Sequence, residues 1–94
     1  MTSSNDPRIH AIKISNSDNV ATCLQEIDVG TRVLVKSNKE DLTVTALDSI
    51  PRGHKIALRH IAQGNAIFKF GEIIGKASLS ISIGCHVHSH NVVD

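Results

Sequence analysis

Hydrophobic and polar residues alternate along much of the chain, and this alternation is the main indication of its fold. Side chains two positions apart in an extended segment point to the same face, so a period of two predicts half-buried β-strands. The alternating stretches are residues 8–15, 33–36, 42–46, 54–61, 66–70 and 78–83. A polar turn at 37–41 separates the second stretch from the third, and we expect these two to pair as a hairpin.

Glycine and proline residues separate these stretches about every ten residues, as turn-forming residues do between short strands. Ile50-Pro51-Arg52-Gly53 is one such turn, and Gln63-Gly64-Asn65 is another. About six or seven short strands with this spacing are typical of a compact antiparallel barrel or clip-like sheet, and they argue against strand–helix–strand units. No internal repeat is evident in the sequence.

One segment, residues 19–30, predicts a short helix of about two to three turns. The apolar positions that fall on one helical face are Val20, Leu24 and Ile27. Ser17 or Asp18 can cap the first turn, and Gly30 can end the helix in the left-handed conformation. Capping alone accounts for the polar pair Asp18-Asn19. The expected fold is therefore mainly β, with this one short helix.

Composition changes this picture mainly by what it excludes. With 94 residues the chain holds one domain, and its two Phe, with no Tyr or Trp, leave Ile, Val, Leu and Ala to build the core. Ten Lys and Arg balance nine Asp and Glu without any block of like charge, so neither a nucleic acid nor a membrane is an expected partner. Unpaired sheet edges would allow the isolated chain to form a homo-oligomer.

The N-terminal segment and the cysteines favour a reducing, cytoplasmic location. Residues 1–9 are mostly polar, and we expect a flexible tail there, ahead of a single domain at 10–94. No apolar signal segment and no run of about 18 apolar residues is present, which predicts neither secretion nor membrane insertion. Cys23 and Cys85 are far apart and form no Cys-x-x-Cys pair, so both are expected to be reduced.

Histidine is the residue type that best fits a chemical role, because six occur in this short chain. His86, His88 and His90 alternate, so in an extended segment their side chains would share one face. Two imidazoles on one face can begin a metal site or an acid–base pair, and we expect this of His88 and His90. His54 follows the turn at Gly53 and can lie at a pocket rim. We expect no such function for His10 and His60.

These residues alone do not name a reaction, but four segments resemble the N-terminal SAF-type domain of the altronate/galactarate dehydratase family. The segments are residues 18–21 (DNVA), 50–58 (IPRGHKIAL), 69–75 (KFGEIIG) and 87–91 (VHSHN). Their order and spacing are similar to that family over roughly residues 10–92, and the second and fourth segments are the most specific. Two mild departures are Phe70, where the family often has Tyr, and Cys85 just before His86.

The resemblance implies a β-clip (SAF-like) fold and a role in a metal-dependent hydro-lyase that eliminates water from a sugar acid. In that family the domain is fused to, or accompanied by, a large catalytic part. The chain therefore resembles a separate small subunit that is inactive without its large dehydratase subunit. Similar small subunits occur in sulfolactate sulfo-lyase, where the leaving group is sulfite. A divalent metal, Fe(II) above all, is implied at a site shared with the large subunit.

The same resemblance suggests roles for particular residues. We expect His54, His88 and His90 to be catalytic, with His88 and His90 also serving as metal ligands. The residues expected to bind the sugar-acid or sulfo-acid substrate are Asp18, Asn19, Lys55, Lys69 and Asn91. The two lysines are the candidates for its carboxylate. Which histidine binds the metal and which transfers protons is left open.

Two other interpretations are carried forward. The chain could be a non-catalytic SAF module that only closes over or stabilises a large subunit. It could also be an independent protein that binds a metal or a sugar acid. A purely structural lid has no need of two histidines on one face, so the histidine cluster separates the first interpretation from a shared active site.

Overall fold

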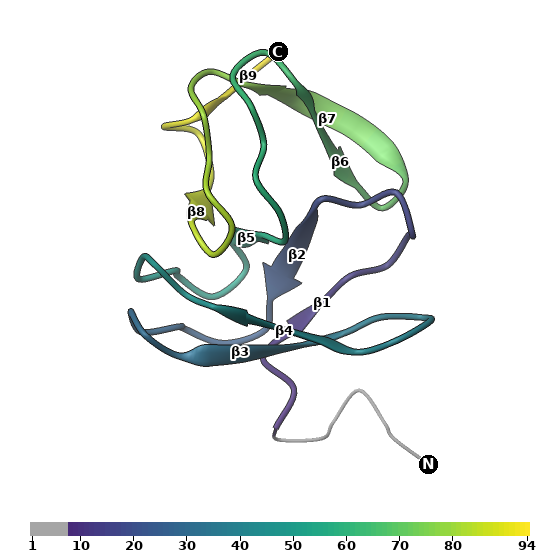
Figure 1. The fold of residues 1–94 in the computed structure, drawn as a ribbon, viewed down its shortest axis with the longest axis vertical. Coiled ribbons are helices and arrows are strands. Elements are labelled where there is room, and N and C mark those ends of the chain that lie inside the picture. Colours follow the sequence, from purple (N-terminus) through teal and green to yellow (C-terminus); the bar gives the residue numbers. More distant parts are fainter. Residues whose placement is uncertain (1–7) are drawn as a thin grey trace.

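A computed structural model describes residues 8–94, and these form nine short strands joined by turns (Figure 1). The strands are β1 (Ala11–Ile12), β2 (Val20–Cys23), β3 (Arg32–Lys36), β4 (Leu42–Thr45), β5 (Lys55–Ala57), β6 (Ala66–Lys69), β7 (Glu72–Ala77), β8 (His86–Val87) and β9 (Val92–Val93). Six of them form a sheet in the order β4-β3-β1-β2-β5-β8, and the other three form a small sheet in the order β6-β7-β9. Only β1 and β3 pair in parallel; the other strand pairs of the described chain are antiparallel.

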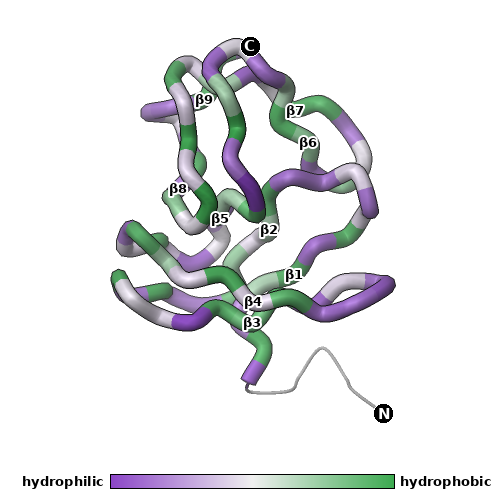
Figure 2. Tube along the Cα trace, viewed as in Figure 1, coloured by the Kyte–Doolittle hydropathy of each residue, from purple (hydrophilic) through white to green (hydrophobic). Residues whose placement is uncertain are grey.

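The mainly β fold and the predicted hairpin are confirmed. β3 and β4 pair in antiparallel register from Arg32↔Thr45 to Val35↔Leu42, and the loop between them is hydrophilic (Figure 2). The C-terminal alternation around Ile81 forms only an isolated bridge to Ile61, not a strand. Among residues 8–94, no helix is long and apolar enough to cross a membrane.

The predicted helix at residues 19–30 is wrong, because its first part is the central strand β2. β2 pairs with β1 on one side and with β5 on the other, so its backbone groups are used in a sheet. Val20, Ala21 and Cys23 are all buried, which means that both faces of β2 are covered. A strand covered on both faces shows no alternation in sequence. The helical spacing of Val20, Leu24 and Ile27 was therefore coincidental.

Four turns share the pattern Ile-x-x-Gly-x, a repeat that was not evident from the sequence alone. They begin at Ile27, Ile50, Ile61 and Ile81. In each turn the residue after the glycine donates its backbone N–H to the carbonyl three positions earlier. The glycine donates its own backbone N–H to the carbonyl of a residue at or just past the end of a strand. That strand residue in return donates its N–H to the carbonyl of the residue after the glycine. All four glycines have φ between 84° and 89°, a region that other residues avoid.

The four isoleucines of these turns hold the hydrophobic core together in pairs. Ile27 bridges Ile50 in one buried cluster, and Ile61 bridges Ile81 in a second cluster. Each of these side chains is at most 2% exposed. The core is therefore built from aliphatic residues packed between paired turns, as the scarcity of aromatic residues suggested. The predicted tail at 1–9 lies mostly outside the described residues, and Ile9 is buried.

Two buried polar residues, Asp18 and Asn19, connect the β1–β2 segment to the small sheet. The Asn19 side chain accepts a hydrogen bond from the backbone N–H of Phe68 and donates one to the carbonyl of Ala66. The Asp18 carboxylate accepts hydrogen bonds from the backbone N–H groups of Ser15, Phe70 and Gly71. Figure 1 shows the β6–β7 turn beside the β1–β2 connection, as these bonds require. Neither residue caps a helix.

Candidate histidine site

Three imidazoles come together where two of the repeated turns lead into neighbouring strands. His54 follows Gly53 and directly precedes β5, and His86 is the second residue after Gly84 and begins β8. β5 and β8 pair in antiparallel register, with Ile56 opposite His86. Because side chains alternate across a strand, His54 then shares a face with His86 and His88. The register of one strand pair therefore explains the whole cluster.

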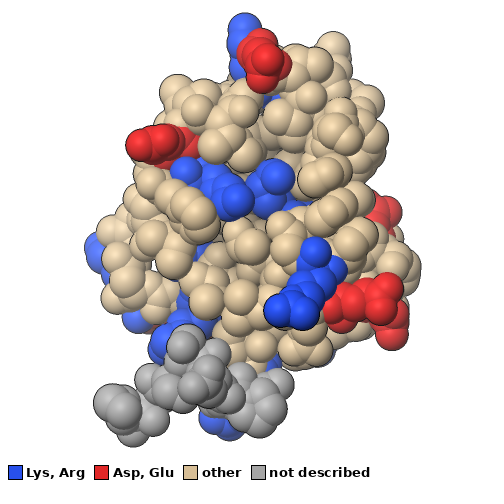
Figure 3. All heavy atoms as spheres, turned by 180° about the vertical axis from the view of Figure 1, so that it is seen from behind, with Lys and Arg blue, Asp and Glu red and all other residues tan. Residues whose placement is uncertain are grey.

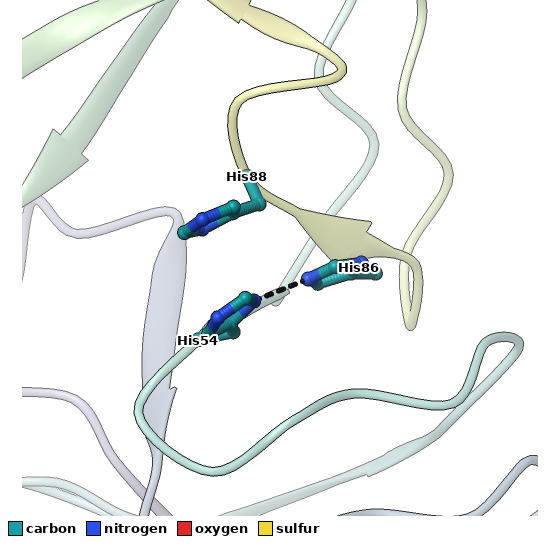
Figure 4. A group of neighbouring side chains, drawn as sticks. All are labelled: His54, His86 and His88. Carbon is teal, nitrogen blue, oxygen red and sulfur yellow. Dashed lines mark hydrogen bonds between the residues drawn. The ribbon is translucent and has the colours of Figure 1, made fainter.

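The three rings are close and nearly parallel (Figure 4). His54 Nδ1 lies 2.8 Å from His86 Nε2, a hydrogen bond in which one ring donates and the other accepts. The rings of His54 and His88 stack with centroids 3.8 Å apart and an interplanar angle of 12°. One nitrogen from each of the three residues lies within 4.8 Å of the others. These distances suit a shared proton or, after ring rotation, a shared metal ion.

The backbone that carries His86 and His88 is held by two further side chains. Asn91 accepts a hydrogen bond from the N–H of His88 and donates one to the carbonyl of His86. Asp48 accepts a hydrogen bond from the N–H of His86. Asn91 is only 4% exposed, so the oxygen and the NH2 group of its side-chain amide both form hydrogen bonds inside the protein. These bonds fix the backbone positions from which the two imidazoles project.

The environment of the cluster favours neutral imidazoles. Burial lowers the pKa of His86, the neighbouring imidazoles lower it further, and Asp48 partly opposes the shift. Burial also lowers the pKa of His88, to which the charges of His54, Lys55 and His90 add. Both rings are therefore neutral at neutral pH, and a neutral imidazole can accept a proton or bind a metal.

Lys55 lies beside the histidine cluster, and Lys69 lies near Lys55. Burial lowers the pKa of Lys55, and the charge of Lys69 lowers it further, so the two ammonium groups are close enough to repel each other. Lys55 also lowers the pKa of His88, which places it next to the cluster. Across the face seen in Figure 3, Lys and Arg side chains lie near the middle as well as at the top, the left margin and the lower part, and acidic side chains lie toward the margins. An anion would relieve the repulsion between the two lysines.

The structure brings together some of the predicted site residues and not others. His54 and His88 are in the cluster, and the ring of His90 lies 4.9 Å from that of His86 but outside the three-histidine group. The side chains of Asp18, Asn19 and Asn91 bond to backbone groups and are at most 4% exposed, so their role in substrate binding stays a prediction.

His86 is the residue that the sequence-based assignment of roles missed. The alternation of residues 86–90 had already placed it on the same face, but nothing in the sequence gave its register against β5. His10 lies outside the group, and its Nδ1 accepts a hydrogen bond from the N–H of Leu34. A shallow hollow lined by Ile12, Ile14 and Lys36 among others contains none of the histidines, and its lining offers little acid–base chemistry.

The chain is similar in sequence to lyases of one family. The profile described as "Altronate/galactarate dehydratase SAF domain" matches residues 9–94. Over 80 residues, 85% of this chain, it is 44% identical to altronate dehydratase from Bacillus subtilis (strain 168) and 45% identical to altronate dehydratase from Escherichia coli (strain K12). It spans only 15% of the length of each of these two enzymes.

A shorter relative is matched over most of its own length. The chain is 41% identical over 58 residues to "(2R)-sulfolactate sulfo-lyase subunit alpha" from Paracoccus pantotrophus. That alignment covers 62% of this chain and 87% of the relative. The residues of the histidine cluster lie within the range 9–94 that the family profile matches.

Proposed function

Because the chain belongs to the altronate/galactarate dehydratase SAF-domain family, we propose that it is the small component of a two-part lyase. In this proposal it acts with a larger dehydratase chain and supplies histidines to an active site that the two chains share. The reaction is the elimination of water from a sugar acid, and the small chain is inactive alone.

The observation that carries this proposal is the convergence of His54, His86 and His88 at one edge of the sheet. Elimination next to a carboxylate requires removal of the proton on the adjacent carbon, and a neutral imidazole is a suitable base. The 2.8 Å bond between His54 and His86 links two such bases. When the ring that donates in this bond takes up a proton at its outer nitrogen, it can pass the shared proton across the bond to the other ring.

Lys55 and Lys69 fit the task of holding the substrate carboxylate. Their ammonium groups repel each other, so a carboxylate between them would be attracted by both. Lys55 lies next to His88, which would put the carbon that loses its proton near the imidazoles. Removing that proton increases the negative charge on the carboxylate side of the substrate, and the same lysines would stabilise that charge.

The histidines also fit a divalent metal, Fe(II) above all, as part of a larger ligand set. Imidazole nitrogen suits iron, and His88 Nδ1 is buried without a hydrogen-bond partner in the described part of the chain. His88 Nδ1 would bind the metal together with ligands from the larger chain, so the hydrogen-bonded pair of His54 and His86 would stay free to accept the proton. When bound, the metal would act as a Lewis acid toward the substrate carboxylate.

A second candidate function is the elimination of sulfite from a sulfo-acid. It is favoured by the alignment with the sulfo-lyase subunit, because 87% of that relative's length is matched by this chain. The chemistry asked of the histidines and lysines is the same in both cases, since a proton leaves from beside a carboxylate. The leaving group would be selected mainly by residues of the larger chain.

Reconstitution tests the proposal. The larger partner is altronate dehydratase from Bacillus subtilis with the segment that matches this chain removed. Adding the full chain is expected to restore the formation of a 2-oxo acid from altronate, measured by trapping with semicarbazide. Sulfite release from sulfolactate, measured with a thiol reagent after this chain replaces subunit alpha of the Paracoccus pantotrophus sulfo-lyase, checks the second candidate.

Substitution then asks whether the histidines take part. His54→Ala, His86→Ala and His88→Ala are each expected to lower the restored activity by at least about 100-fold. His60→Ala is the matched control, because His60 is exposed and lies outside the cluster. Full activity in all three cluster variants would leave only the interpretation of a structural lid, and no activity with the wild-type chain on either substrate would refute the lyase role. Tight metal binding by the isolated chain in calorimetry would favour an independent metal-binding protein.

A further inference from the structure

The turn between β6 and β7 presents an aromatic side chain on a strained backbone. Lys69 pairs with Glu72, so Phe70 and Gly71 form a two-residue hairpin loop. Both have positive φ, 58° for Phe70 and 78° for Gly71, as a type I′ turn requires. Asn followed by Gly is the favoured pair in such a turn, and Phe70 is the one residue other than glycine with positive φ among residues 8–94. A bulky side chain in this conformation is strained.

The protein holds this strained turn firmly and leaves its aromatic ring exposed. The buried Asp18 carboxylate accepts hydrogen bonds from the backbone N–H groups of both Phe70 and Gly71. The Phe70 side chain nevertheless remains 55% exposed, and Ile73 in the same hairpin is 63% exposed. Strain of this kind persists only where the surroundings over-determine it, and it concentrates at functional positions. Packing within the isolated chain does not explain the choice of phenylalanine here.

The exposed ring lies close to the residues of the proposed active site. Lys69 Nζ is 4.9 Å from the centroid of the Phe70 ring. Lys69 is one of the two lysines proposed to hold the substrate carboxylate, so Phe70 lies next to a residue of that site. The strand that carries Lys69 is bonded through Phe68 to Asn19, which directly precedes β2, and β2 pairs with β5. A larger chain that closed over a substrate held by Lys69 would therefore reach the Phe70 turn as well.

We propose that Phe70 is an anchor that inserts into an apolar pocket of the larger lyase chain and docks the two chains around the histidines. The inference rests on the proposed function, since it names the surface through which that partner binds. In the altronate dehydratases most of the length lies outside the matched segment, so a much larger polypeptide accompanies this domain there. Because the positive charge of Lys69 lies beside the ring, we expect acidic groups at the rim of the partner's pocket.

The test separates docking from stability, because relief of strain and loss of docking act in opposite directions. Phe70→Asn and Phe70→Gly suit the turn better than phenylalanine and are expected to raise the melting temperature of the isolated chain by about 3–6 °C. The same variants are expected to weaken binding to the truncated Bacillus subtilis altronate dehydratase by at least about 30-fold in biolayer interferometry. Val29→Asn is the control, since Val29 is 64% exposed on a turn of the other sheet, and it should leave the affinity unchanged.

Three results would overturn the proposal. The first is an affinity for the truncated enzyme that Phe70→Asn changes less than two-fold, or no binding of the wild-type chain at all. The second is a dimer of the isolated chain that Phe70→Asn dissolves in sedimentation velocity while the affinity for the enzyme is kept, which would make a second copy the occupant. The third is normal binding with lost activity, which would place Phe70 in the chemistry instead.

Failure of the docking proposal and failure of the proposed function can be told apart. At saturating concentration Phe70→Asn should recover activity close to wild type, because the histidines remain in place. His88→Ala should bind the truncated enzyme normally and stay inactive. Binding that depends on Phe70 without any elimination activity would uphold docking and refute the lyase role. Activity that does not depend on Phe70 even at subsaturating concentration of the chain would do the reverse.

Discussion

Replacing Asp18 with asparagine tests how the β6–β7 hairpin is held against the rest of the protein. The Asp18 side chain is 3% exposed and accepts three backbone hydrogen bonds. Its Oδ2 atom accepts from the N–H groups of Ser15 and Phe70, each at 3.0 Å, and its Oδ1 atom accepts from Gly71 at 2.8 Å. Asparagine has nearly the same shape, so the change removes charge and one acceptor without opening a cavity.

The expected loss follows from this geometry. An asparagine oxygen can take the Oδ2 position and keep two bonds, but its NH2 group then faces the N–H of Gly71. One charge-assisted bond is lost and a buried donor is left unpaired, which together cost about 2–4 kcal/mol. A protein of this size has a free energy of unfolding of about 5–14 kcal/mol, and each kcal/mol shifts the melting temperature by about 4–8 °C. The Asp18→Asn variant should therefore melt about 8–32 °C lower.

The effect of pH on Asp18 gives an independent check. Burial alone would raise the pKa of Asp18, but the backbone N–H groups of Gly71, Ser15 and Phe70 more than offset this and lower it below 3.8. As the pH falls, the unfolded chain therefore binds a proton at this residue before the folded chain does. The stabilisation is complete above about pH 3.8 and is lost as the pH falls through the lower pKa of the folded state.

Urea unfolding at pH 7 and at pH 3 measures both effects. Asp28→Asn is the matched control, because Asp28 is exposed and the same chemical change there should alter the free energy of unfolding by less than about 0.5 kcal/mol. The wild-type protein should lose stability between the two pH values, and Asp18→Asn should lose less of it. An Asp18→Asn variant as stable as Asp28→Asn at pH 7 would refute the role assigned to this carboxylate.

Three further outcomes are expected. Gly84→Ala should lower the free energy of unfolding by about 3 kcal/mol or more, since an added Cβ would overlap the backbone carbonyl oxygen of Thr45, the last residue of β4. Gly64→Ala, with similar φ and open space, should cost only about 1–2 kcal/mol in the same urea experiment. Cys23 is buried, which raises the pKa of its thiol to about 11, whereas Cys85 is partly exposed although burial and Asp48 also raise its pKa. A thiol reagent at pH 8 should therefore label Cys85 in the folded protein and reach Cys23 only after unfolding. The imidazole of His88 should titrate below 6.5 in NMR spectra of the metal-free chain, and a midpoint at or above that value would contradict the described burial and charge of the cluster.

How far the sequence predicted the fold depended on whether a segment was covered on one face or on two. The half-buried strand β3 alternates in burial from Val33 to Val35, and it was found at once. The central strand β2 is buried on both faces, so its sequence carries no period of two, and it was mistaken for a helix. The recurring Ile-x-x-Gly-x turns were missed because they occur at unequal intervals and share only two residue types.

The candidate site was predicted as far as local alternation reaches. Residues 86–90 placed several imidazoles on one face, and the turn at Gly53 marked His54 as a second contributor. The choice among them depended on which residue of β5 lies opposite His86, and strand register is a long-range property. The roles of Asp48 and Asn91 in holding the backbone of β8 are also long-range or geometric, and residue type alone did not indicate them.

The edge of the sheet at β8 indicates how a partner can approach. β8 is the last strand of its sheet, and an unpaired edge normally invites another strand. Here the groups that point away from β5 are already bonded to side chains, because Asp48 accepts from His86, while Asn91 accepts from His88 and donates to His86. Addition of a strand would have to break these bonds. A second chain is therefore expected to contact the imidazoles and lysines themselves, which leaves the geometry of the cluster intact as the chains assemble.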